Sequence, residues 1–251
     1  MFDVKPLALV DLDDNLFQTA RKMVETPTHI ASRTESGGPS GYMTEVQKQF
    51  ITWLLKTADV IPVTARSIEA FSRVEIPFSG PAVCSHGGVI LSPDRTPDAQ
   101  WHAQMATLMA PYKERFHSLS EAAIAIGREM GLSLRGWVVE ELDTSFYVVT
   151  KHNNETDQAL ADLLCEMKKR DLISDLYVHL NGNNLALMPL GLNKRFAVQE
   201  IIKRDKAVNG ERPIIGFGDS ISDLGFMSEC HFWGTPGNSQ ITRTIMESIH
   251  G

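Results

Sequence analysis

A short apolar run, residues 7–10, ends at two aspartates one position apart, Asp11 and Asp13. A run of this length without polar interruption predicts a strand buried on both faces, which is typical of a parallel sheet. Open sheets of this kind bind their ligands at the carboxyl ends of the strands. Because side chains alternate along an extended chain, both carboxylates are expected to face one crevice. The feature predicts an α/β fold with a polar site at this strand end.

Two further predicted strands end in the same way. The strand at 59–63 is followed by Thr64, and the strand at 212–217 is followed by Asp219 and Asp223. Parallel strands that converge on one edge would bring these carboxylates and the hydroxyl together with Asp11 and Asp13. A site built from oxygen ligands suits a hard cation, and we expect magnesium.

Each strand end has a plainer interpretation. Asp11 can open a turn, and Asp13 or Asp14 can cap the following helix, because aspartate is favoured at both positions. Asp219 or Ser220 can cap a helix in the same way. For the first strand end alone, the two interpretations are equally well supported.

The remaining core elements follow from local patterns. The polar segment 26–42 is expected to be a loop or flap that either contacts substrate or has no role. Thr44 and Gln47 fit a capping box that starts a helix. Five apolar residues at helical spacing in that helix are expected to face the core: Val46, Phe50, Trp53, Leu54 and Leu55.

An inserted domain is predicted between two parts of the core. A third strand at 82–84 leads into Ser85-His86-Gly87-Gly88, where the glycines permit a sharp change of direction. Beyond it lie predicted helices at 105–130 and 156–170 and strands at 137–150 and 176–189, before a helix that begins near residue 193. We therefore expect a three-layer Rossmann-like core, 1–86 and 188–251, with a smaller α/β cap domain at 87–187.

Composition excludes several classes of protein. The 251 residues suffice for a full core, and 24 Lys and Arg against 31 Asp and Glu give a net charge of -7, which disfavours nucleic acid as a partner. No apolar run reaches the length of a membrane span, and the three cysteines have no metal or redox spacing. We expect a cytoplasmic protein with buried, reduced thiols. Its oligomeric state does not follow from the sequence.

Four segments in chain order resemble the motifs of the haloacid dehalogenase superfamily of phosphohydrolases. They are Asp11-Leu12-Asp13-Asp14-Asn15, Val63-Thr64-Ala65-Arg66, Lys194, and Gly218-Asp219-Ser220-Ile221-Ser222-Asp223. Segments 84–88 and 185–194 are similar to the Cof-type and sucrose-phosphatase-like branch. In that branch a cap domain is inserted between the second and third motifs.

The resemblance implies a role for each motif residue. Asp11 would attack phosphorus, and Asp13 would protonate the leaving alcohol and then deprotonate water. Thr64 would donate a hydrogen bond to a phosphoryl oxygen, and Lys194 would offset negative charge. Mg²⁺ would be held by Asp11, the main-chain carbonyl of Asp13 and Asp219, with Asp223 as a ligand either directly or through water.

Some positions depart from the family pattern or lie beside the motifs. Asn15 replaces a usual Thr, Ser222 a usual Asn, and Arg195 a common Gly. Arg66 is a candidate for binding a second part of the substrate. It is equally well explained as an arginine that lies at the surface without a role in binding. The further candidate substrate contacts are Asn15, Ala65, Arg195 and Asn238.

The sequence thus predicts a magnesium-dependent phosphomonoesterase that acts on a small phosphorylated metabolite, with a sugar phosphate as the expected substrate. A phosphotransferase or mutase using the same aspartyl phosphate is the first alternative. A catalytically silent anion-binding regulatory protein on the same fold is the second.

Overall fold

The computed structural model describes residues 4–24, 26–154, 157–180 and 182–250, which form two compact units. The first unit comprises Met1–Ala99 and Asn193–Gly251, and the second comprises Gln100–Leu192. These bounds differ from the expected insertion at 87–187. The chain does not leave the core at residue 87, because strand β6 (Val89–Leu91) turns back and pairs antiparallel with strand β5 (Ala82–Cys84).

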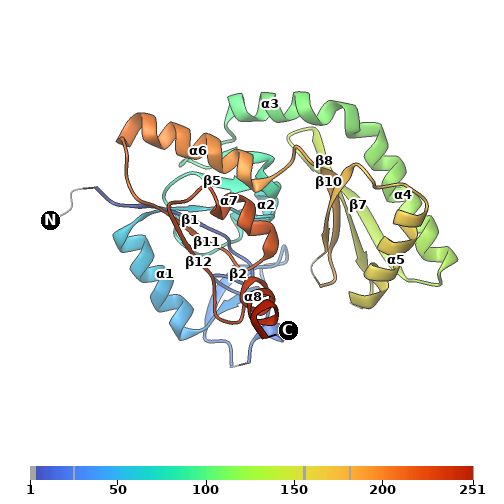
Figure 1. The fold of residues 1–251 in the computed structure, drawn as a ribbon, viewed down its shortest axis with the longest axis horizontal. Coiled ribbons are helices and arrows are strands. Elements are labelled where there is room, and N and C mark those ends of the chain that lie inside the picture. The colour runs from blue at the N-terminus through green and yellow to red at the C-terminus, as the bar shows by residue number, and fades with distance from the viewer. Residues whose placement is uncertain (1–3, 25, 155–156, 181, 251) are drawn as a thin grey trace. The chain divides into compact units, whose positions relative to one another are not determined.

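The first unit is built on a parallel sheet with the strand order β12-β11-β1-β4 (Figure 1). Its strands are β1 (Leu7–Val10), β4 (Asp59–Pro62), β11 (Ile214–Phe217) and β12 (Phe232–Gly234). Val10 is in register with Phe217 on one side and Pro62 on the other, so three strands end at the same level. The predicted parallel α/β core is confirmed.

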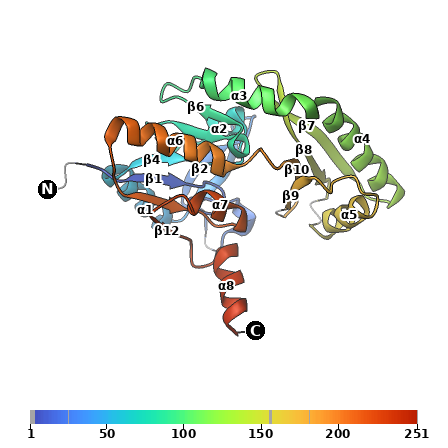
Figure 2. The same ribbon diagram turned by 45° about the horizontal axis from the view of Figure 1, so that its top comes forward.

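Helices lie on both faces of this sheet. Figure 1 shows α1 (Glu45–Thr57) and α6 (Lys194–Asn209) on opposite sides of it, which gives three layers. The short helices α2 (Ile68–Ser72) and α7 (Leu224–Met227) follow β4 and β11, and Figure 2 shows α8 (Gln240–His250) after β12.

Helix α1 begins with the predicted capping box of Thr44 and Gln47. The predicted core face is wrong for two of its residues, because Val46 is 75% exposed and Trp53 is 55% exposed. The prediction is confirmed for Leu54, which is buried together with Ile51, a residue outside the predicted set. Phe50 is half-buried and packs edge-on against Phe217 of β11, with ring centroids 5.2 Å apart, and Trp53 lies beside it at 6.0 Å.

The segment predicted as a loop at 26–42 contains a β-hairpin. Strands β2 (His29–Arg33) and β3 (Pro39–Met43) pair antiparallel. The turn closes with a 2.7 Å bond from Thr34 N to Gly38 O, and Gly37 supplies the left-handed conformation at φ +84°. Glycine-rich turns and polar strand residues gave this stretch the composition of a loop.

The second unit is an antiparallel sheet with the strand order β7-β8-β10-β9 and helices packed against it. Its strands are β7 (Leu134–Glu141), β8 (Thr144–His152), β9 (Leu176–Leu180) and β10 (Leu185–Pro189), and its helices are α3 (Ala99–Met109), α4 (Lys113–Glu129) and α5 (Asp157–Lys169). The predicted helix 105–130 is interrupted at Ala110–Tyr112, where Pro111 lies. The predicted strand at 137–150 corresponds to β7 and β8, and the stretch 176–189 corresponds to β9 and β10; each pair is antiparallel. Residue 156, where the predicted helix 156–170 begins, lies outside the described residues.

None of the described helices is long and apolar enough to cross a membrane. Cys84 is buried, whereas Cys165 is exposed, so the expectation of buried thiols is wrong for the latter.

Candidate active site

The segments that follow β1, β4 and β11 are joined by main-chain hydrogen bonds. Asp11 N donates to Phe217 O at 2.8 Å, and Val63 N donates to Val10 O at 2.7 Å. The parallel ladder therefore continues one residue beyond the strands. It brings the first residues after each strand to one edge of the sheet.

Three buried carboxylates meet at this edge. One oxygen from each of Asp11, Asp219 and Asp223 lies within 4.8 Å of the other two. All three residues are buried. Such a set is costly to desolvate unless positive charge lies close by.

Lys194 supplies one positive charge to this cluster. Its Nζ donates to Asp11 Oδ1 at 2.6 Å and to Asp223 Oδ1 at 2.7 Å. The lysine is the first residue of α6, and the Asn193 side chain caps that helix by accepting from Arg195 N. Burial opposes the charged form of Lys194, but the Asp11 and Asp223 carboxylates outweigh burial and raise the pKa of the ammonium.

One ammonium does not balance three carboxylates, and the pKa values reflect this. Burial raises the pKa of Asp11 well above its usual range despite Lys194, and the charges of Asp223 and Asp219 add to the rise. Burial, with the charges of Asp223 and Asp14, raises the pKa of Asp219 to about 7. Burial acts in the same direction on Asp223, but bonds to Lys194 and Ser220 lower its pKa. A divalent cation with oxygen ligands fits this donor set because it would supply the missing charge.

The loop that carries Asp219 and Asp223 is tightly built. Ser220 donates two hydrogen bonds to Oδ2 of Asp223. One comes from its main-chain N at 3.1 Å and the other from its hydroxyl at 2.7 Å. A Cβ on Gly218 would lie 2.6 Å from Cβ of Asp223. Only glycine lets the loop fold this closely. The Ser-x-x-Asp spacing could have identified Ser220 as the support of Asp223.

A strained turn, Ser85–Gly87, supports two of these loops. All three residues are left-handed, with φ values of 50°, 57° and 99°. Ser85 N donates to Arg66 O at 2.7 Å, and His86 N donates to Thr64 O at 3.2 Å. On the other side, a Cβ on Gly87 would lie 2.5 Å from Asn193 O. The turn therefore contacts both the segment after β4 and the start of α6.

Thr64 is fully buried directly after β4. Its Oγ1 accepts a hydrogen bond from Arg66 N at 3.1 Å. Since a hydroxyl can donate one bond while it accepts another, the hydrogen of Thr64 remains a donor.

Asp13 differs from the other acidic residues of the site. Its side chain is 48% exposed, and its carboxylate is held by Arg66. Arg66 Nε lies 2.8 Å from Oδ2, and the Arg66 NH2 group lies 2.7 Å from Oδ1. Arg66 thus lies beside the acidic cluster, and two of its donors face Asp13.

The remaining candidates lie in different settings. The buried Asn15 amide donates to Asp11 O at 2.8 Å, so it supports the loop. Arg195 pairs with Glu229 near the start of α6. Asn238 is exposed, and Ala65 is half-buried between Thr64 and Arg66.

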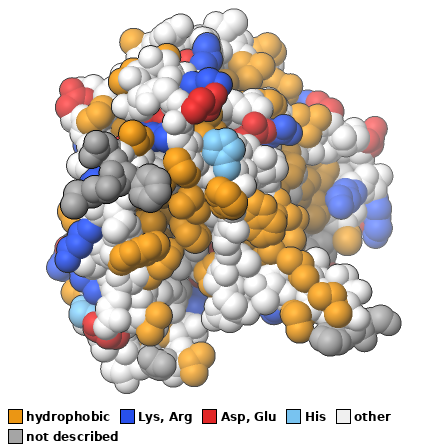
Figure 3. All heavy atoms as spheres, turned by 60° about the vertical axis from the view of Figure 1, so that its left-hand side comes forward, with side chains coloured by type: hydrophobic (Ala, Val, Ile, Leu, Met, Phe, Trp, Pro, Cys, Tyr) orange, Lys and Arg blue, Asp and Glu red, His pale blue; other side chains and the backbone are white. Residues whose placement is uncertain are grey.

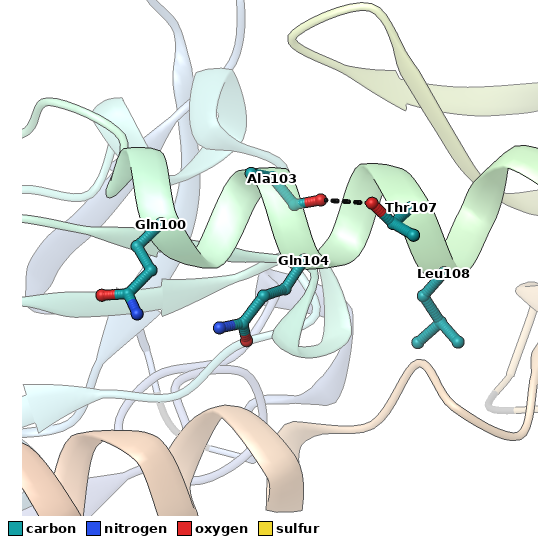
Figure 4. Close-up of a pocket in the computed structure, with 5 residues that line it drawn as sticks. All are labelled: Gln100, Ala103, Gln104, Thr107 and Leu108. Carbon is teal, nitrogen blue, oxygen red and sulfur yellow. Dashed lines mark hydrogen bonds between the residues drawn. The ribbon is translucent and has the colours of Figure 1, made fainter.

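Two pockets lie away from these residues. Figure 4 shows one along α3, lined by residues without ionisable side chains: Gln100, Ala103, Gln104, Thr107 and Leu108. The other, of about 570 Å³, lies at the opposite ends of the strands, where its lining includes Leu7, Asp59 and Arg212. Figure 3 brings the left-hand side of Figure 1 forward, and hydrophobic side chains gather on that face among charged ones. Neither pocket contains the acidic cluster.

No family model matches the sequence, and no curated protein matches it. Solved structures do resemble it. Protein 0175 of Thermoplasma acidophilum is 14% identical, with 96% of this chain and 89% of that chain covered and a TM-score of 0.57.

Two phosphatases are also similar in structure. The sucrose-phosphatase of Synechocystis sp. PCC6803, solved with sucrose and phosphate, is 14% identical, with 98% and 97% covered and a TM-score of 0.53. The C-terminal domain of trehalose-6-phosphate phosphatase from C. albicans is 11% identical, with 89% and 73% covered and a TM-score of 0.54. At these identities the likeness concerns the fold. The chain shares the α/β fold of these three structures, which agrees with the fold class that the sequence predicts.

Proposed function

We propose that the protein is a magnesium-dependent phosphomonoester hydrolase that acts through an aspartyl phosphate. The observation that carries the proposal is the buried cluster of Asp11, Asp219 and Asp223 around Lys194. Structural ion pairs rarely combine three buried carboxylates with one cation, since removing that charge from water is costly. A site that handles a phosphate dianion and a metal has a chemical need for such a set.

In the first step an oxygen of Asp11 forms a bond to phosphorus, and the bond from phosphorus to the ester oxygen breaks. Asp13 gives its proton to the leaving oxygen, which departs as an alcohol. The Thr64 hydroxyl donates to a phosphoryl oxygen, and the Lys194 ammonium offsets the charge shared by Asp11 and the phosphoryl group. These three contacts act where negative charge gathers as the group is transferred.

In the second step water forms a bond to phosphorus, and the bond to Asp11 breaks. The Asp13 carboxylate takes the proton that the water loses, so that inorganic phosphate leaves and the starting protonation states return. We assign the metal to Asp11, Asp219, Asp223 and the main-chain carbonyl of Asp13. When bound, Mg²⁺ neutralises carboxylate and phosphoryl charge so that the two can approach.

We propose a sugar phosphate as the substrate. The structural neighbours named as phosphatases act, by those names, on sucrose phosphate and trehalose 6-phosphate. The fold alone does not determine a substrate, because one fold carries many activities. A panel of phosphorylated sugars, with added sugar acceptors to detect phosphoryl transfer, distinguishes hydrolase from transferase.

The first experiment measures hydrolysis of an aryl phosphate with Mg²⁺, with a chelator, and by an Asp11→Asn variant. Turnover that both changes abolish is the expected result. Asp175→Asn is a matched control, since Asp175 is exposed in the second unit and its carboxylate pairs with Arg115. Turnover that persists with the chelator would contradict the metal, and turnover by Asp11→Asn would contradict the nucleophile.

A further inference from the structure

Arg66 and Asp13 form a two-point contact at the rim of the site. Nε and the NH2 group of Arg66 each face one oxygen of the Asp13 carboxylate, at 2.8 and 2.7 Å. This parallel arrangement adds directional control that a single ion pair lacks. The Asp13 side chain is 48% exposed, whereas that of Arg66 is 19% exposed. The arginine is the better-fixed partner of the two.

The guanidinium itself is held from several sides. It lies over the Phe17 ring, 5.0 Å from the centroid, and its NH1 group reaches Ala70 O at 3.5 Å. Its main-chain N donates to Thr64 Oγ1. Phe17 is fully buried, so the surface below the guanidinium is rigid. Arg66 therefore links Asp13 to the segment that carries Thr64.

A general acid acts only within hydrogen-bond reach of the atom that it protonates. A half-exposed carboxylate on a loop can adopt several rotamers, and fixing one of them requires a partner. We propose that Arg66 is a positioning residue that orients the Asp13 carboxylate for proton transfer to the leaving group. The inference rests on the proposed hydrolase function. It replaces the expectation that Arg66 binds a second part of the substrate, because two of its donors face Asp13.

Leaving-group dependence distinguishes positioning of an acid from a purely structural role. We would measure kcat/KM for 4-nitrophenyl phosphate and phenyl phosphate with wild type, Arg66→Gln and Arg66→Lys. The nitrophenolate leaves readily without a proton, whereas phenolate benefits from one. The expected loss in both variants is about 30-fold or more for phenyl phosphate and about threefold for the nitrophenyl ester, because a misplaced acid loses part of the roughly 10²–10⁴-fold that general acid catalysis contributes.

Arg66→Lys keeps the charge but loses the two-point contact. Arg115→Lys is the matched control, because Arg115 contacts both oxygens of Asp175 in the second unit. Thermal unfolding of each variant shows whether the fold is retained.

An unequal loss on the two esters in both Arg66 variants, with the control unchanged, supports the inference. Equal losses on both esters, or a wild-type ratio in Arg66→Lys, would overturn it while the proposed function stands. Wild type that hydrolyses neither ester would overturn the proposed function, and the inference with it.

Discussion

The Nζ atom of Lys194 lies 2.6 Å from Oδ1 of Asp11, and both residues are buried. The same ammonium contacts Asp223. Lys194→Met would leave these carboxylates without their cation. We expect the free energy of unfolding to fall by about 3–5 kcal/mol without added metal, which is typical of breaking a buried ion pair. Urea unfolding at neutral pH measures the loss.

Lys203→Met is the control for this change. Lys203 lies on the same helix with a side chain that is largely exposed beside Glu200, so its loss should alter stability by less than about 1 kcal/mol. Added Mg²⁺ should restore part of the stability of Lys194→Met. Equal stabilities of the two variants would contradict the role of Lys194 as the cation of the cluster.

The pKa of Asp219, raised to about 7, predicts a pH dependence of the metal-free protein. In the unfolded chain this carboxyl titrates near its usual value of about 4. Between these values the folded state holds more protons than the unfolded state, so stability must fall as the pH rises. Asp219 contributes a slope of at most about 1.4 kcal/mol per pH unit over this window.

Unfolding free energies measured from about pH 4.5 to about pH 7.5 with a chelator present test this slope. This range lies between the pKa of Asp219 in the unfolded chain and just above its pKa in the folded protein. Asp219→Asn should flatten the decline, because the amide does not titrate. Asp175→Asn should leave the decline in place, because in the wild type a hydrogen bond from Arg115 lowers the pKa of the Asp175 carboxyl. A wild-type stability that rises with pH across this window would contradict the assignment.

Much of the site could be predicted because parallel strands end together. The apolar runs before Asp11, Thr64 and Asp219 indicated buried strands, and their register brings these residues to one edge. Lys194 was different. A lysine at the start of a helix has no local signal of burial, so its contact with Asp11 followed only from the family resemblance.

Other features depend on contacts that are distant in sequence. The glycines after His86 predict the end of the core at the turn Ser85–Gly87, but the chain returns as β6 against β5. The side-chain amide of Asn15 could bind a ligand, but it donates a hydrogen bond to the main-chain oxygen of Asp11. Neither partner is visible in the local pattern. Trp53 shows the same limit for helix faces, because it has the helical spacing of a core residue and yet is 55% exposed.

Gly87 is expected to tolerate no side chain. Its φ of +99° costs an L residue about 1–2 kcal/mol. A Cβ would also lie 2.5 Å from Asn193 O, and such an overlap adds about 1–3 kcal/mol. Gly87→Ala should lower the unfolding free energy by the sum and reduce kcat/KM, because Asn193 precedes Lys194. Chemical unfolding and aryl phosphate hydrolysis measure the two effects.

Gly37→Ala separates the backbone cost from the overlap. Gly37 has a φ of +84°, and nothing lies within 4 Å of a Cβ placed on it. This variant should lose only the backbone component and keep its activity. If Gly87→Ala were no less stable than Gly37→Ala, the contact with Asn193 would have no energetic role.

Arg212 allows stability to be tested apart from chemistry. It is buried just before β11, where it contacts Asp205 and Asp59 and donates to Lys5 O at 2.9 Å. These residues lie at the opposite strand ends from Asp11. Arg212→Met should lower the unfolding free energy by about 3 kcal/mol, at the lower end for a buried pair because Asp59 is half exposed. Activity per folded molecule should be unchanged, since the parallel strands separate the network from the site.

Arg115→Met is the control. It removes an exposed pair with Asp175 and should lower the unfolding free energy by less than about 1 kcal/mol. Urea unfolding combined with kcat/KM at low temperature measures both quantities, and a loss of kcat/KM in folded Arg212→Met would mean that the two ends of the sheet are coupled.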